Sequence, residues 1–200
     1  MRKLPVLFGC LFLTACLPSV TVVPRPEPVD NTKVLALINS LSNELGDFKS
    51  KGRLTDYETA HPGLGYSKRY ETLRAPLFID VYAFNMGIGD LPDGVASDLF
   101  AAVYKKNLEE LKAFYKGGLR EVREEWVTFR GIKFKRAKFL IVGGDHELGG
   151  LESSMFLTIY NNSILKIRAS RVPLRLAADG DQLTAAFMKA LAADMAKVKK

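Results

Sequence analysis

The segment at residues 152–171 reads ESSMFLTIYNNSILKIRASR, and it decides the fold. It contains two runs of strand-forming residues, Glu152–Tyr160 and Ile164–Arg171, on either side of the turn Asn161-Asn162-Ser163. A connection this short joins strands that run antiparallel to each other. The sequence therefore predicts a β-hairpin in the C-terminal part of the chain.

Strand and helix patterns continue on the N-terminal and C-terminal sides of this hairpin. Alternating apolar residues predict strands at 66–73, 75–86, 119–130 and 132–142, and apolar residues at helical spacing predict helices at 32–49, 95–116 and 181–199. Strand 75–86 is apolar on both of its faces, so each face needs a cover. We therefore expect an α+β fold, in which one antiparallel sheet of about six strands is flanked by helices on both faces.

The strand at 132–142 changes its apolar phase. Phe134 occupies an even position, whereas Phe139 and Ile141 occupy odd positions. Because one extra residue exchanges the two faces of a strand, this change predicts a β-bulge near Lys135-Arg136.

The N-terminal segment has the pattern of an export signal. Arg2 and Lys3 precede an apolar stretch, Leu4–Ala15, that is too short to cross the roughly 30 Å hydrocarbon layer of a bilayer. The stretch ends in Leu13-Thr14-Ala15-Cys16, which resembles the lipobox of bacterial lipoproteins. The resemblance implies cleavage before Cys16 and acylation of that cysteine, with palmitate among the acyl chains. An ordinary cleaved signal with a chance cysteine is the alternative.

The lipid on Cys16 would anchor the protein to a membrane, because two or more acyl chains hold a protein on a bilayer stably. In Gram-negative lipoproteins, which the N-terminus resembles, the residue after the cysteine sorts the protein. Leu17 is not the aspartate of inner-membrane retention. We therefore expect the outer membrane, with the protein facing the periplasm. Cys10 lies inside the apolar stretch and would be removed with it, which leaves no disulfide.

Prolines separate the signal from the folded part of the chain. Pro18, Pro24, Pro26 and Pro28 favour an extended spacer, which at about 3.1 Å per residue reaches some 30 Å. The expected organisation is a signal peptide at 1–15, a proline-rich tether at 16–30, an amphipathic helix at 31–50 and an α/β sandwich domain at 51–200. The amphipathic helix either docks on the domain or presents its apolar stripe to a partner.

The order of these elements resembles the PsbP family of photosystem proteins and its bacterial lipoprotein relatives. A long helix follows the first strand pair, and a C-terminal helix follows a run of strands. The stretches Leu64-Gly65-Tyr66-Ser67 and Leu165-Lys166-Ile167-Arg168 also resemble segments of secreted proteins of this kind. The resemblance implies a PsbP-like α/β/α sandwich over about residues 55–200, and it implies no catalytic residues.

Composition and motifs do not favour an enzyme. The sequence is 48% apolar and 26% charged, which is typical of a globular protein, and its two cysteines and two histidines are too few for a structural zinc site. It contains no Gly-x-Ser-x-Gly elbow, no His-Glu-x-x-His helix and no phosphate-binding glycine loop. We therefore expect a non-catalytic protein without a cofactor.

Three consecutive residues, Asp145, His146 and Glu147, carry side chains that can bind a metal or act in acid–base chemistry. They lie between the glycine pairs Gly143-Gly144 and Gly149-Gly150, which permit sharp backbone turns. A solvated hairpin loop and a metal or acid–base site both fit this composition.

Three aspartates are further candidates for contacts. Asp80 interrupts an apolar strand, so its carboxylate needs a partner, and Arg69 and Arg168 are candidates for an ion pair. Asp90 and Asp93 lie in the glycine-rich loop at 87–94, where Asp93 can cap the next helix. Contact with calcium or with a partner is the alternative for these two residues.

Basic residues gather in the strand at 132–142, where Arg136 and Lys138 lie, and again in the last strand. The formal net charge is +7, and Arg2 and Lys3 contribute two of these charges. Outside the inner membrane, such a patch meets anionic lipid, lipopolysaccharide or cell-wall polymer rather than nucleic acid. A solvated strand face is the alternative.

Together these features predict a membrane-anchored periplasmic lipoprotein that acts as a non-catalytic binding or accessory module for an envelope protein partner. Two alternatives stay open: a carrier or sensor of an anionic amphiphile, and a small envelope hydrolase that uses His146. Lipidation is expected at Cys16, and candidate ligand or partner contacts are Asp80, Asp90, Asp93, Asp145, His146, Arg136 and Lys138.

Overall fold

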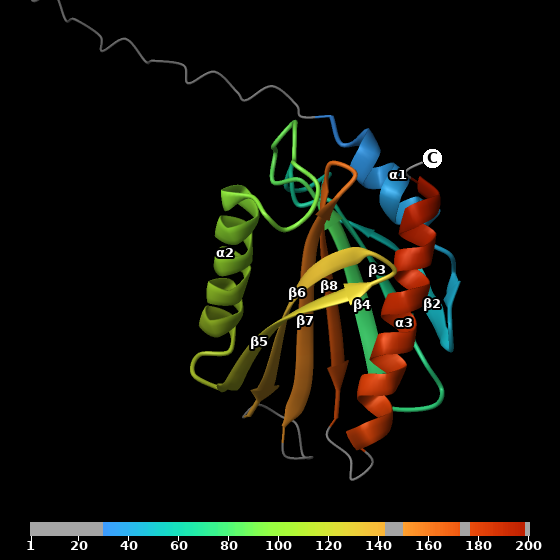
Figure 1. The fold of residues 1–200 in the computed structure, drawn as a ribbon, viewed down its shortest axis with the longest axis vertical. Helices are drawn as coiled ribbons and strands as arrows, with labels where there is room; N and C mark the ends of the chain where they lie inside the picture. Colours follow the sequence, from blue (N-terminus) through green and yellow to red (C-terminus); the bar gives the residue numbers. More distant parts are fainter. Residues whose placement is uncertain (1–29, 143–149, 173–176, 199–200) are drawn as a thin grey trace, which may run out of the picture.

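The computed structural model describes residues 30–142, 150–172 and 177–198 (Figure 1). Within these ranges, eight strands form one antiparallel sheet in the order β1-β2-β3-β4-β8-β7-β6-β5. The strands are β1 (Glu44–Leu45), β2 (Phe48–Asp56), β3 (Tyr66–Glu71), β4 (Leu77–Phe84), β5 (Leu119–Phe129), β6 (Ile132–Ile141), β7 (Leu151–Tyr160) and β8 (Ser163–Arg171).

Three helices of the described ranges pack against this sheet, in two layers. They are α1 (Thr32–Ser40), α2 (Asp98–Phe114) and α3 (Ala177–Val198). Figure 1 shows α1 and α3 on one side of the sheet and α2 on the other. Each side has its own apolar core: α1 and α3 cover the first, which includes Ile79 and Ile167, and α2 covers the second, which includes Phe139 and Leu157. None of the described helices is both long enough and apolar enough to cross a bilayer.

The hairpin predicted from residues 152–171 is confirmed as β7 and β8. Tyr160 pairs with Ser163, and the pairing continues without a register shift to Glu152 and Arg171. The two turn residues, Asn161 and Asn162, have φ values of 48° and 59°. Asparagine tolerates this left-handed region, and two such residues in succession match the twist of the strands they join.

The sheet has eight strands rather than about six, because the expected helix at 32–49 is shorter than predicted. It begins at Thr32 but ends at Ser40, where Leu41 turns to an extended conformation with ψ 126°. Residues beyond it form β1 and β2, and β2 is largely polar, so alternation did not reveal it. The helical spacing still identified buried residues: Leu41, Leu45 and Phe48 enter the same core as the helix.

Helix α1 docks on the domain. Val34, Leu37 and Ile38 are buried, and the helix contacts α3, β3 and β4. Its apolar stripe therefore forms part of the core and is not presented to a partner.

The predicted β-bulge near Lys135-Arg136 is wrong. β6 pairs with β7 in continuous register from Lys135 to Ile141, and the irregularity lies in β5, between Arg120 and Arg123. The apolar phase changes because different helices cover the two ends of β6. Phe134 packs in the core that α1 and α3 cover, whereas Phe139 packs in the core that α2 covers. Figure 1 shows the β5–β6 hairpin curving toward α3.

Candidate functional site

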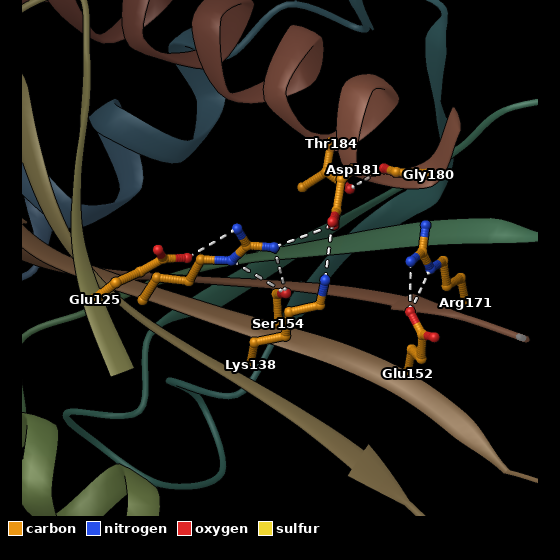
Figure 2. Close-up of polar contacts among 9 residues, drawn as sticks. Glu125, Lys138, Glu152, Ser154, Arg171, Gly180, Asp181 and Thr184 are labelled. Carbon is orange, nitrogen blue, oxygen red and sulfur yellow. Dashed lines mark hydrogen bonds and ion pairs between the residues drawn. The ribbon is translucent and has the colours of Figure 1, made fainter. Parts of the chain in front are cut away.

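Arg136 and Lys138 belong to a polar network between the sheet and the N-terminal part of α3. Figure 2 shows Lys138 and Ser154 on the sheet below Asp181 of α3. Lys138 Nζ donates to Asp181 Oδ2 at 2.8 Å, and Arg136 Nη2 contacts Asp181 Oδ1 at 3.2 Å. Arg136 also donates to Glu125 Oε1 at 3.1 Å and to Ser154 Oγ. Two cations and two carboxylates therefore balance each other in this cluster.

The cations of the network hold Asp181 in its charged form. Burial acts to raise the pKa of Asp181, but the hydrogen bond from Lys138 and the positive charges of Lys138, Arg136 and Arg171 outweigh it. The net effect lowers the pKa of this carboxyl. A carboxylate stabilised in this way is a structural anchor for α3, and it is poorly suited to accept a proton from a substrate.

A second ion pair lies beside the network. Arg171 Nε donates to Glu152 Oε2 at 2.8 Å, across the β7–β8 ladder (Figure 2). Gly180 lets α3 approach this pair closely, because a Cβ at this position would lie 1.8 Å from Arg171 Nη1. The N-terminal part of α3 therefore packs on the sheet through the ion pairs of Asp181 and through the close approach at Gly180.

The basic residues of β6 do not share one face of the sheet. Lys135, Arg136 and Lys138 each form an ion pair, whereas Lys133 is exposed. Arg136 and Lys138 point to the α3 side, whereas Lys135 lies on the α2 side with its Nζ 3.3 Å from Glu124 and 4.8 Å from the ring centroid of Trp126. Adjacent strand residues alternate between faces, so a basic run in sequence divides between the two sides of the sheet.

Asp80 is buried and forms the predicted ion pair with Arg69. Arg69 Nε donates to Asp80 Oδ1 at 2.7 Å and Arg69 Nη2 donates to Asp80 Oδ2 at 3.0 Å, a bidentate arrangement. The hydrogen bond to Asp80 raises the pKa of Arg69. Arg168 is opposite Asp80 in register but donates instead to Ser153 and to the Tyr115 hydroxyl. Asp80 therefore has a structural partner.

Asp90 and Asp93 are exposed in the connection between β4 and α2. The cap of α2 is Ser97, whose side chain accepts from the Phe100 amide, so the predicted cap at Asp93 is wrong. Asn162 organises this connection, since it accepts from the Leu91 amide at 2.6 Å and donates to the Gly89 carbonyl.

Cys16, Asp145 and His146 lie outside the described residues. Among the residues that are described, no group of three or more histidine, cysteine or acidic side chains is arranged to hold a metal ion.

A different site emerges between α2 and the sheet, which we name the α2 cavity. Its volume is about 230 Å³. Tyr82 and Phe84 of β4 and Lys166 of β8 contribute from the sheet, and α2 and the β2–β3 connection supply the walls. The complete lining is Tyr57, Leu64, Tyr82, Phe84, Met86, Lys106, Asn107, Glu110 and Lys166.

Lys166 is the unusual member of this lining. Its Nζ lies 5.0 Å from the ring centroid of Tyr82 and 5.8 Å from that of Phe84. Burial lowers the pKa of Lys166; the charge of Glu110 acts in the opposite direction, and that of Arg168 adds to the lowering. Burial also raises the pKa of Tyr82 to about 12, so the phenol keeps its proton at neutral pH. The α2 cavity thus joins aromatic surface, a hydroxyl donor and a half-buried cation.

The β2–β3 wall of the α2 cavity is fixed by Glu58. This carboxylate accepts from the amides of Gly63 and Gly65, both at 2.8 Å, and from the side chain of Asn31. Gly65 has φ +64°, and a Cβ there would lie 2.0 Å from the Ala83 carbonyl oxygen. Only glycine fits this approach, which holds the connection against the end of β4.

Sequence reasoning missed the α2 cavity, although it assigned many of the lining residues to the correct elements. Lys166 was grouped with the surface basic residues. The available signal was its position in Ile164-Leu165-Lys166-Ile167, a strand that the pattern places under cover on both faces.

Comparisons with known proteins give a distant similarity of structure. No family model and no curated protein matches the sequence. Among solved structures, the chain is similar to the solution structure of cyanobacterial PsbP (CyanoP) from Synechocystis sp. PCC 6803. The TM-score is 0.45 and the sequence identity is 13%, over 74% of this chain and 80% of that chain. PsbP is the family that the element order resembles, and no residue role is taken from it.

Proposed function

We propose that this protein is a non-catalytic binding or accessory module of the cell envelope, anchored in the outer membrane by lipid on Cys16 and facing the periplasm. The observation that carries the binding role is the α2 cavity, which combines apolar walls with a half-buried lysine. In contrast, the ionisable clusters around Asp80 and Asp181 are closed ion pairs that stabilise the fold.

The lipobox Leu13-Thr14-Ala15-Cys16 supports the anchor, and the prolines that follow it support a tether. A tether of this kind leaves the domain free to meet an envelope protein near the membrane surface. Helix α1, which follows the proposed tether in the sequence, is docked on the domain, so the tether would join the folded unit at this helix.

In-cell crosslinking tests the partner. A photoreactive residue replaces Trp126, an exposed aromatic on β5, and a matched control replaces Lys51, an exposed residue on β2. The two positions lie toward opposite edges of the sheet, on β5 and on β2. We expect a specific adduct with one envelope protein from only one of these two positions, and we expect the assembly of that protein to change when the lipoprotein is deleted. Equal labelling from both positions, together with intact envelope complexes in the deletion strain, would contradict the proposal.

A second function, carrier or sensor of an anionic amphiphile, is favoured by a specific observation. The α2 cavity lies between a helix and the sheet, where such a ligand would be partly shielded from water, and Lys166 supplies a positive charge in its lining.

A further inference from the structure

We propose that the α2 cavity binds a small amphiphile with a single carboxylate on an alkyl or aryl body, and that Lys166 is its counter-ion. This inference rests on the second proposed function and names its site and the chemical class of its ligand.

The size of the α2 cavity sets the size of the ligand. Its volume of about 230 Å³ exceeds the roughly 150 Å³ of a protein cavity that accepts benzene. It is below the range of roughly 300–1,000 Å³ that drug-sized ligands occupy. The cavity therefore suits an aromatic ring or a short alkyl chain and is too small for a lipid with two acyl chains.

The lining separates an apolar region from a charged one. Leu64, Phe84 and Met86 provide apolar contact for the body of the ligand. Lys166 and the hydroxyl of Tyr82 provide donors for a carboxylate. This is the usual composition of a small-molecule site, in which a few polar groups orient a ligand that is mostly in apolar contact.

The charges of the lining favour a monoanion. Lys106 and Glu110 lie 4.0 Å apart and offset each other, which leaves the charge of Lys166 in excess. In the described part of the chain, Lys166 is placed over aromatic rings, and no acidic group is within salt-bridge distance of its Nζ. Partial burial removes water from the charged amine of Lys166, so a bound carboxylate would supply an interaction that replaces this water.

An isostere series tests this inference on the purified full chain. Octanoate, octanol and octylamine share one alkyl body and differ in the charge of the head group, so calorimetric titration of each separates charge from apolar contact. We expect octanoate to bind best and octylamine worst. Lys166→Met should weaken octanoate by about tenfold or more, because a charge-assisted hydrogen bond is lost. Glu110→Gln should strengthen octanoate, since a repelling charge near the ligand is removed.

The matched control is Lys105→Met. Lys105 and Lys106 are neighbours on α2 and each faces a glutamate four residues later, but only Lys106 lines the α2 cavity. Lys105→Met should leave octanoate binding unchanged. If Lys166→Met does not fold, Leu64→Trp replaces it: Leu64 is 51% exposed at the edge of the cavity, and the larger side chain should block octanoate.

Equal affinity for the three octyl compounds would overturn the inference, and so would octanoate binding that neither Lys166→Met nor Leu64→Trp reduces. Neither result would touch the membrane anchor or the envelope partner, because the crosslinking experiment does not use the α2 cavity. Loss of the partner adduct alone would likewise leave the octanoate result standing.

Discussion

Gly65 occupies a position where the backbone leaves no room for a side chain. Its φ is +64°, and a Cβ would lie 2.0 Å from the Ala83 carbonyl oxygen. Gly65→Ala should therefore lower the free energy of unfolding by about 2 kcal/mol or more, from the left-handed conformation and the overpacking together. Gly52→Ala is the control, since Gly52 has φ +77° but no atom within 4 Å of a Cβ. It should cost only about 1 kcal/mol. Urea unfolding measures the free energy of unfolding of both variants. Equal losses would show that the backbone around Ala83 can make room for a side chain at Gly65.

Asp80 and Arg69 are unequal partners. The side chain of Asp80 is 11% exposed and that of Arg69 is 50% exposed. Arg69→Met leaves a buried carboxylate without its ion pair and should destabilise the fold by about 2–3 kcal/mol. Asp80→Asn leaves an arginine that water can solvate, and should cost about 1 kcal/mol. Chemical unfolding of the two variants measures these losses in the free energy of unfolding. A larger loss for Asp80→Asn than for Arg69→Met would show that Asp80 is not effectively buried.

Asp80 and Lys166 both interrupt an apolar strand pattern, but only the role of Asp80 could be predicted from that interruption. Asp80 breaks a run of apolar residues, so the sequence alone indicated a buried charge and proposed Arg69 as a partner. Lys166 also lies between apolar residues, but lysine is common on exposed strand faces, and its neighbours on α2 come from a segment far away in sequence. The cavity therefore could not be assembled from local pattern.

At the scale of elements, α3 is fixed to the domain by an aspartate near each of its ends. Asp181 is bound by Lys138 and Arg136 of β6, and Asp194 accepts from the Ser42 amide at 2.8 Å. Burial acts to raise the pKa of Asp194, but the hydrogen bonds from Lys197 and Ser42 lower it overall. Both carboxylates therefore stabilise the docked helix in their charged forms.

The lowered pKa of Asp181 makes part of this stability depend on pH. A carboxyl whose folded pKa lies below its ordinary value of 3.8 contributes above that value, and the contribution is lost as the pH falls through the folded pKa. At pH 7, Asp181→Asn should lower the free energy of unfolding by about 1 kcal/mol, a figure reduced for the 50% exposure of this side chain. Thermal unfolding at pH 7 and at pH 3 should show the difference from the unmodified protein shrinking in acid.

Glu109→Gln is the control for the acid experiment, because Glu109 forms an exposed ion pair with Lys105 on α2, on the side of the sheet opposite α3. Its effect should be small at both pH values. A difference for Asp181→Asn that stayed constant between pH 7 and pH 3 would contradict the anchoring role.

The helices and strands show why boundaries were harder to predict than buried positions. The β7–β8 hairpin was predictable because its apolar pattern and its turn residues agree. The segment after Ser40 was not, since Leu41, Leu45 and Phe48 continue a helical spacing while the chain has already turned into β1 and β2. Tertiary packing determines the secondary structure of this segment, whereas the local pattern indicates only which of its residues are buried.

For the whole molecule, the two faces of the sheet are covered differently. The α1–α3 face is closed by a large apolar core, tight aromatic packing of Phe187 against Phe48 and Tyr70, and the Asp181 and Asp194 anchors. The α2 face has a smaller core and contains the α2 cavity beside it. The larger core and both aspartate anchors therefore lie on one face, and the proposed binding site lies on the other. Asn31, next to the proposed tether, donates to Glu58 of the β2–β3 wall, so the tethered end of the domain is also close to this wall.

The proposed function depends most directly on the lipid anchor at Cys16. The decisive measurement is radiolabelled palmitate incorporation, followed by separation of membrane and soluble fractions, for the unmodified chain and for Cys16→Ser. We predict label and membrane association for the unmodified chain, and loss of both for Cys16→Ser. Label that persists in Cys16→Ser, or an unmodified protein that is unlabelled and soluble, would contradict the account.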